Sequence, residues 1–211
     1  MKIRKAYLYV FNTMSDWEVG YLTAELNTGR YFKKGLDSIN VITVGIDKDP
    51  ITTMGGLKVI PKISMNECVF HSEDVLILPG GETWTWAVHD HILEKAKDAL
   101  EKGTVVAAIC GATLGLAKTG LLDSSYHTSN DLEYLKMIVP NYYGEKHYKR
   151  EVAVNDKNLV TASGIAPLEF TVEVLRLLDV FKPEVLNLWL NLYKTHESRY
   201  FFELMKEIKN D

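Results

Sequence analysis

Thr104 to Gly120 reads TVVAAICGATLGLAKTG, and this stretch decides the fold of the chain. Its unbroken apolar run, Val105 to Ile109, predicts a strand that is buried on both faces of a parallel sheet. The residues after Cys110 suit a short helix, with Gly120 placed as its C-terminal stop. A strand, a sharp turn that carries a nucleophilic side chain, and a helix together make a nucleophile elbow.

The elbow requires small residues around the nucleophile, because the backbone is crowded and strained there. Ala108 and Ala112 lie two residues before and two after the cysteine, and Gly111 follows it directly. We therefore expect Cys110 at the N-terminus of a helix, where the helix dipole and the free amides favour the thiolate. The alternative is a structural cysteine, since free cysteine is among the most buried residue types.

Length and composition place the chain among soluble globular proteins. Its 211 residues suit one large domain or one domain with an extension, and 46% of them are hydrophobic. The net charge of -4 and the lack of a basic run argue against a nucleic-acid partner. No membrane span or signal peptide is evident, so we expect a cytoplasmic protein without a membrane partner. Cys68 and Cys110 do not resemble a disulfide framework or a zinc site, and we expect no metal and no cofactor.

Strands and helices alternate along the chain, which predicts an α/β fold with a mainly parallel sheet. We expect strands at 6–11, 39–46, 74–78, 105–109, 151–154 and 159–162, and a hairpin over 52–60. We expect further helices at 17–28, 64–70, 87–102 and 131–139, and one that opens at Pro167. The apolar residues after Pro183 surround a helix, so it packs against its own sheet or against a second subunit. We therefore divide the chain into an α/β domain, 1–180, and a C-terminal helical extension, 181–211.

Acidic and glycine residues follow the predicted strands, at the edge where open α/β sheets bind ligands. Asp16-Trp17-Glu18 lies past the first strand, although Glu18 could also be an ordinary acid in the first turn of a helix. Pro79-Gly80-Gly81 follows strand 74–78, and one of its amides could join that of Gly111 in an oxyanion hole, or the pair could be an ordinary turn. Trp84 could wall a pocket or belong to the core.

Three motifs in this order resemble those of the ThiJ/PfpI family: Asp16-x-Glu18, Leu78-Pro79-Gly80-Gly81 and Ala108-x-Cys110-Gly111-Ala112. Gly120-Leu121-Leu122-Asp123 after the elbow helix is also typical of that family. The family belongs to the class I glutamine amidotransferase-like superfamily, which includes the parkinsonism-associated deglycase. The resemblance covers about residues 6–180, and it implies a flavodoxin-like three-layer sandwich that usually assembles as a homodimer or a larger homo-oligomer.

The resemblance also implies roles for individual residues. Cys110 matches the family nucleophile, and Glu18 matches the protonated carboxyl group that hydrogen-bonds the thiolate. Gly81 and Gly111 match the glycines whose amides form the oxyanion hole. A thiolate that receives a hydrogen bond at a helix end is the reactive form of cysteine.

The chain departs from the family pattern after the elbow. Counted from Gly120, Asn130 falls on the position of the family's histidine, and His127 lies three residues earlier. An asparagine cannot act as a general base, so we take His127 as the catalytic partner of Cys110. A late His-x-Glu is missing, which argues against a glutamine amidotransferase. Further pocket residues are expected to be Asp16, Gly80, Trp84 and Asn130.

We expect a cysteine-dependent enzyme that acts on a small carbonyl or amide compound. The activities known in the family include peptidase or amidase action, glyoxalase or deglycase action, and isocyanide hydration, and the residues do not choose among them. A first alternative is a non-catalytic redox or stress-response protein, in which an oxidant converts Cys110 to a sulfinic acid beside a protonated Glu18. A second alternative is a ligand-binding domain that kept the scaffold and lost its chemistry. The expected partners are a small-molecule substrate or oxidant and a second copy of the chain.

Overall fold

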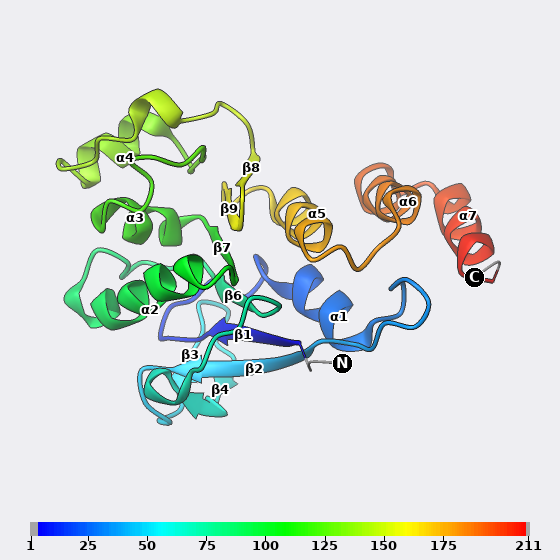
Figure 1. Ribbon diagram of the computed structural model, residues 1–211, viewed down its shortest axis with the longest axis horizontal. Helices are drawn as coiled ribbons and strands as arrows, with labels where there is room; N and C mark the ends of the chain where they lie inside the picture. The colour runs from blue at the N-terminus through cyan, green and yellow to red at the C-terminus, as the bar shows by residue number, and fades with distance from the viewer. Residues whose placement is uncertain (1–3, 210–211) are drawn as a thin grey trace.

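A seven-stranded sheet forms the centre of the molecule, in the order β5-β2-β1-β6-β7-β9-β8 (Figure 1). The computed structural model describes residues 4–209. The strands of this sheet are β1 (Lys5–Tyr9), β2 (Asn40–Gly45), β5 (Ile63–Ser64), β6 (Val75–Leu78), β7 (Val105–Ile109), β8 (Ala153–Asp156) and β9 (Leu159–Ala162). Neighbouring strands pair in parallel, except that β8 runs antiparallel to β9. The predicted hairpin is confirmed as β3 (Ile51–Thr52) and β4 (Lys58–Val59), which form a separate antiparallel pair.

Helices cover both faces of the sheet, which gives the flavodoxin-like three-layer sandwich that the sequence predicts. They are α1 (Gly20–Thr28), α2 (Asp90–Glu101), α3 (Gly111–Lys118), α4 (Leu132–Ile138), α5 (Pro167–Leu177), α6 (Pro183–Thr195) and α7 (Ser198–Lys209). Short 3-10 helices are η1 (Met65–Glu67), η2 (Ala87–His89) and η3 (Glu145–His147). Figure 1 shows α1 and α5 on one side of the sheet and α2 and α3 on the other. Among the described helices, none is both long and apolar enough to span a lipid bilayer.

The neighbouring strands β6 and β7 have the burial that is typical of a parallel sheet. Every residue of β6 and of β7 is buried, as expected for strands covered by helices on both faces. Because parallel strands end at the same edge, Leu78 and Ala108 are register partners, and the chain leaves both strands at neighbouring points. This register brings the loop after β6 next to the elbow after β7.

Helix α1 begins later than the sequence predicts. Its first residue is Gly20 rather than Trp17, and neither Ser15 nor Asp16 caps it. The backbone N–H of Ser15 donates to Gly80 O at 2.9 Å, and the Asp16 carboxylate accepts from the N–H of Gly55 at 2.6 Å. These long-range bonds hold residues 12–19 as a loop at the end of β1.

Two other predicted elements also differ from the structure. The predicted helix over 64–70 is only the 3-10 turn η1, in which the Glu67 carboxylate accepts from Ser64 and closes a capping box. The strand predicted over 151–154 begins and ends two residues later, as β8, and the chain then turns at Lys157, which has a positive φ of 55°. In both places the limits of the element differ from the predicted limits because of a local hydrogen bond or a backbone angle, and the strand order of the sheet is not affected.

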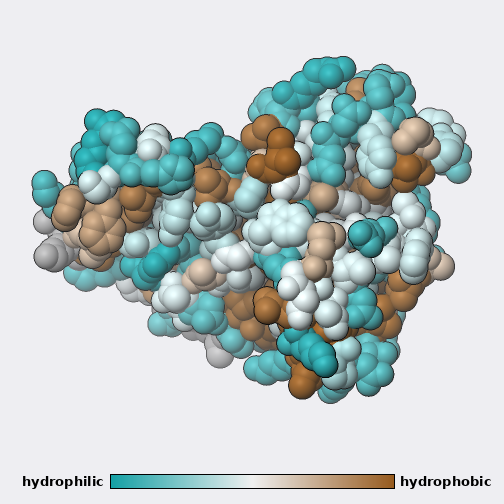
Figure 2. Space-filling view, turned by 180° about the vertical axis from the view of Figure 1, so that it is seen from behind, coloured by the Kyte–Doolittle hydropathy of each residue, from teal (hydrophilic) through white to brown (hydrophobic). Residues whose placement is uncertain are grey.

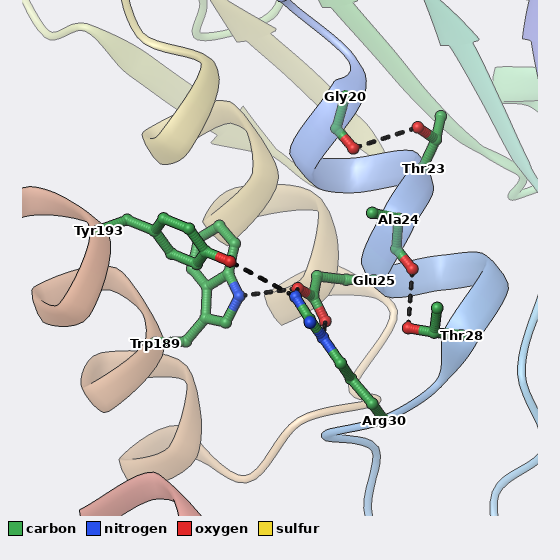
Figure 3. Close-up of polar contacts among 8 residues, drawn as sticks. All are labelled: Gly20, Thr23, Ala24, Glu25, Thr28, Arg30, Trp189 and Tyr193. Carbon is green, nitrogen blue, oxygen red and sulfur yellow. Dashed lines mark hydrogen bonds and ion pairs between the residues drawn. The ribbon is translucent and has the colours of Figure 1, made fainter. Parts of the chain in front are cut away.

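A buried carboxylate joins the C-terminal helices to the α/β domain. Figure 3 shows Glu25 of α1 between Arg30 and the indole of Trp189 from α6. Trp189 Nε1 donates to Glu25 Oε1 at 3.0 Å, and Arg30 Nε donates to Oε2 at 3.0 Å. The side chain of Glu25 is 1% exposed, so these donors compensate the cost of burying its charge. In the view from behind, the outline dips beside the lobe that the C-terminal helices form, and hydrophobic residues surface in small groups among hydrophilic ones (Figure 2).

Candidate active site

Cys110 stands at the turn between β7 and α3 with φ 59° and ψ -125°. A positive φ is strained for a residue with a Cβ, and such strain collects at functional sites. The strained residue is held in place by its backbone: its N–H donates to Ala162 O at 2.9 Å, and its carbonyl accepts from the N–H of Thr113 at 3.1 Å. The local geometry is therefore that of the predicted elbow, with the sulfur at the carboxyl end of the sheet.

Glu18 is fully buried beside Cys110. Its Oε2 accepts from the N–H of Gly80 at 2.5 Å, whereas its buried Oε1 accepts no hydrogen bond within the described chain. Burial raises the pKa of this carboxyl group, although contacts with Gly80, Cys110 and Ser15 act in the opposite direction. A buried carboxyl oxygen without a donor is satisfied when it carries a proton and donates it. The geometry thus favours a neutral Glu18 that faces the cysteine.

Asn130 is the side chain that hydrogen-bonds the sulfur. Its Nδ2 lies 3.3 Å from Cys110 Sγ. The orientation of the amide follows from its other end, because Oδ1 accepts from the N–H of Gly164 at 2.8 Å and from Ser163 Oγ at 3.4 Å. The sulfur therefore has a fixed donor that cannot take up a proton.

His127 does not join Cys110, contrary to the role that the sequence analysis gave it. Its Nδ1 lies 2.7 Å from Ser125 O, and its Nε2 lies 2.6 Å from the hydroxyl of Tyr142. The ring is fully buried, and burial lowers its pKa. Because both ring nitrogens have these partners, His127 fixes the path of the chain that carries Asn130. Asn130, rather than His127, lies beside the sulfur.

The pKa of Cys110 is raised, whereas the helix terminus by itself favoured a lowered value. Burial is the main cause, and a negative charge on Glu18 adds to it. Asn130 and the N–H of Gly111 act in the opposite direction, since both donate to the sulfur. A neutral Glu18 removes the charge repulsion, so the thiolate depends on the protonation of its neighbour.

The glycines after β6 and β7 pack against each other at the same edge. A Cβ placed on Gly111 would lie 2.6 Å from Gly81 O and 3.4 Å from Gly81 N, and one placed on Gly80 would lie 2.6 Å from the Cβ of Cys110. Both positions therefore require glycine. The N–H of Gly80 donates to Glu18, so the amides of Gly81 and Gly111 are the two that match the predicted oxyanion hole.

Trp84 both belongs to the core and forms part of the wall of the pocket, the two roles that were open from the sequence. The ring is 1% exposed and stacks on His89 with 4.8 Å between ring centroids, and its Nε1 donates to Pro79 O at 2.8 Å. It also lines the cleft that opens onto Cys110. Asp16 does not line this cleft, and its carboxylate instead holds Gly55 of the β3–β4 hairpin.

A cleft of about 380 Å³ leads to the sulfur. Its lining residues come from the loop before α1, the β3–β4 hairpin, the loop after β6, and the helices α3 and α4. They are Ser15, Trp17, Met54, Gly81, Glu82, Trp84, Thr85, Cys110, Gly111, Leu114, Asn130, Tyr134 and Ile138. A cavity of this size suits a small molecule or one large side chain.

Gly164 is the main site residue that the sequence analysis missed. A Cβ there would stand 2.7 Å from Cys110 Sγ and 3.1 Å from Glu18 Oε1, so the loop after β9 closes over the thiol and the carboxyl group. The strand β9 pairs with β7, which places Ser163-Gly164 at the same sheet edge as the elbow. The rule that sites lie at the carboxyl ends of adjacent strands would have found it, had the strand order been known.

The second cysteine, Cys68, does not line the cleft. Cys68 is buried, and burial raises its pKa to about 11. Both cysteines are free. Among residues 4–209, no group of three or more His, Cys, Asp or Glu side chains could hold a metal ion.

A parallel sheet whose central strand ends in a strained cysteine, faced by a buried carboxyl group, defines a nucleophile-elbow protein of the α/β class. The particular family follows from comparison: the chain belongs to the DJ-1/PfpI family, whose model matches residues 4–177. This confirms the resemblance to the ThiJ/PfpI family.

Several relatives cover nearly the whole chain. The "Uncharacterized protease YoaZ" of Bacillus subtilis (strain 168) is 61% identical over 208 residues, 99% of each protein. The "Uncharacterized protease YdeA" of the same organism is 33% identical over 202 residues, 95% of each. The crystal structure of a thiJ/pfpI family protein from Bacillus anthracis has a TM-score of 0.95 and 62% identity, over 98% of this chain and 97% of that one. A more distant relative, 20% identical over 72% of this chain and 79% of its own length, is named "Glutathione-independent glyoxalase DJR-1.2" in Caenorhabditis elegans.

Proposed function

We propose that this protein is a cysteine hydrolase of acyl compounds, in which the Cys110 thiolate attacks the carbonyl carbon of an amide or ester. The observation that carries the proposal is the set of groups around one sulfur: the buried Glu18 carboxyl, the Asn130 amide at 3.3 Å and the N–H of Gly111. Two relatives that cover at least 95% of the chain are named as proteases, which agrees with chemistry at an amide bond.

Cys110 and Glu18 share one proton in this proposal. The two adjacent buried acids do not both ionise readily, because a charge on Glu18 raises the pKa of Cys110. The donors Asn130 and Gly111 favour the charge on sulfur, and the partnerless Oε1 of Glu18 favours the proton on the carboxyl group. The reactive state of the pair is a thiolate beside a neutral acid, because protonation of Glu18 removes the charge that raises the pKa of Cys110.

The first half of the reaction forms an acyl-enzyme. The sulfur of Cys110 forms a bond to the carbonyl carbon, and the carbonyl π electrons move to oxygen, where the amides of Gly81 and Gly111 stabilise the charge. When the intermediate collapses, the bond to the leaving group breaks, and the departing amine or alcohol takes the proton of Glu18. The products of this half are a thioester on Cys110 and an ionised Glu18.

The second half restores both groups. Glu18 takes a proton from a water molecule as that water adds to the thioester carbon. The carbon–sulfur bond then breaks, and its electron pair returns to Cys110 as the thiolate. The released carboxylic acid loses its own proton to solvent, and Glu18 is again neutral.

Hydrolysis of p-nitrophenyl esters and peptide p-nitroanilides by the wild type, Cys110→Ala and Cys68→Ala tests this mechanism. We expect release of nitrophenol or nitroaniline by the wild type and by Cys68→Ala, none above background by Cys110→Ala, and an acyl mass on the Cys110 peptide. Equal turnover by all three proteins would overturn the proposal. Consumption of methylglyoxal without any ester or amide hydrolysis would also overturn it, in favour of the glyoxalase chemistry named for the distant relative.

A further inference from the structure

The cleft above Cys110 has apolar walls that come from separate segments of the chain. Trp17 precedes α1, Met54 lies in the β3–β4 hairpin, Leu114 is on α3, and Tyr134 and Ile138 are on α4. Trp17 is 53% exposed, and Met54 and Tyr134 are each 44% exposed, although large apolar groups are usually withdrawn from water. Exposed apolar groups that surround a cavity mark a surface that a ligand covers.

Backbone and carboxylate hydrogen bonds hold these walls in place. The N–H of Met54 donates to Met14 O at 2.9 Å, and the Asp16 carboxylate accepts from Gly55 at 2.6 Å, so the hairpin is fastened to the loop after β1. The N–H of Tyr134 donates to Asp131 Oδ1 at 2.8 Å, which caps α4. A wall that is built before the ligand arrives costs little to order on binding.

The charge of the cleft restricts its ligand further. Apart from the Cys110 thiolate, Glu82 is the only charged side chain among the lining residues, which all belong to the described part of the chain, and these residues include neither Lys nor Arg. An anion would therefore meet a carboxylate at the mouth and find no cation to bind. An uncharged apolar group meets Trp17, Met54 and Tyr134 with no such penalty.

We propose that the substrate is an uncharged acyl compound whose acyl group carries an aromatic or branched aliphatic side chain. This inference rests on the proposed function, because it places the carbonyl group at Cys110 and the side chain against the apolar walls. The occupant of these walls reaches the sulfur, since Cys110 and Asn130 line the same cleft of about 380 Å³. Small anionic carbonyl compounds such as 2-oxo acids are excluded.

Alkylation of Cys110 by three related probes tests the substrate class. Iodoacetamide is small and neutral, N-benzyl iodoacetamide is neutral and aromatic, and iodoacetate is an anion. In each case the thiolate forms a bond to the methylene carbon, and iodide leaves with the electron pair of its bond. Rates normalised to N-acetylcysteine are expected to rise about tenfold for the benzyl probe and to fall about tenfold for iodoacetate, relative to iodoacetamide.

Wall variants show where this selectivity arises. Tyr134→Ala and Met54→Ala should each lower the benzyl preference, the ratio of the benzyl rate to the iodoacetamide rate of the same variant, about threefold or more. Tyr143→Ala is the matched control, because Tyr143 is 73% exposed and does not line the cleft. Glu82→Gln should raise the rate with iodoacetate relative to the rate with iodoacetamide. Equal normalised rates for the three probes, or wall variants that slow all probes alike, would overturn the inference.

A second measurement tests ligand binding in the cleft of a variant that lacks the Cys110 sulfur. Calorimetric titration of Cys110→Ala with phenylacetamide and with phenylacetate should show tighter binding of the neutral compound, and Tyr134→Ala should remove that difference. An unreactive Cys110 with selective binding overturns the proposed function and leaves the cleft assignment standing. A reactive Cys110 with no preference in either measurement overturns the substrate class alone.

Discussion

Gly164→Ala is the substitution that most directly tests the geometry around the nucleophile. The added methyl group would stand 2.7 Å from Cys110 Sγ, 2.9 Å from its Cβ and 3.1 Å from Glu18 Oε1. Ordinary contacts between carbon and neighbouring heavy atoms are about 3.5–4.0 Å, so the sulfur must move by about 1 Å. A displacement of that size at a reacting atom costs about a hundredfold in rate. The backbone of Gly164 does not have a positive φ, so alanine is compatible with the fold.

The assay is the second-order rate of Cys110 alkylation by iodoacetamide, followed by peptide mass spectrometry, together with urea unfolding. We expect the alkylation rate to fall about a hundredfold, with a loss of about 1–3 kcal/mol in the free energy of unfolding from overpacking. Gly20→Ala is the control, because a Cβ there meets no atom within 4 Å. An unchanged alkylation rate in folded Gly164→Ala would refute the placing of this loop against the thiol.

Three further predictions concern the site and its support. Asn130→Ala removes a donor that lowers the pKa of Cys110 and should therefore raise the midpoint of its alkylation profile, as read from rates between pH 5 and 10. Burial lowers the pKa of His89 from 6.5 to about 4, so its contribution to stability is present above pH 6.5 and is lost as the pH falls toward 4. The free energy of unfolding, measured in urea, should therefore fall between pH 7 and pH 4 by about 3 kcal/mol less in His89→Gln than in the wild type. Glu25→Ala leaves the indole N–H of Trp189 unpaired and should lower the free energy of unfolding by about 2–4 kcal/mol, measured by the same method at pH 7.

The fold was predictable because its signals are local. The apolar runs of β6 and β7 are long enough to show strands that are buried on both faces, and the cysteine after β7 shows the elbow. Local signals also mark helix ends: Pro167 and Pro183 open α5 and α6 as predicted, and Gly29 follows the last residue of α1 with φ 60°. Each of these features follows from backbone angles that the residue itself favours.

The site was only partly predictable because several of its contacts depend on long-range pairing. Asn130 reaches Cys110 because His127, three residues earlier, is bound to Tyr142, and no pattern in the sequence indicates that bond. Gly164 reaches the sulfur through the pairing of β9 with β7. Met54 lines the cleft through a hairpin that is fastened to the loop after β1. Residue type alone pointed to an imidazole, whereas the path of the chain selected an amide.

The amide beside the sulfur has a consequence for the pH dependence of any reaction at this site. A histidine in the place of Asn130 would titrate near neutral pH, and the site would then have three titrating groups instead of two. Asn130 keeps one protonation state, and the neighbouring His127 has both nitrogens engaged elsewhere. The ionisable side chains in contact with the sulfur are then reduced, within the described chain, to Cys110 and Glu18 themselves. Because this pair shares one proton, its two macroscopic pKa values set both limbs of the rate profile, and Glu18→Gln should abolish the limb at which the carboxyl group loses its proton.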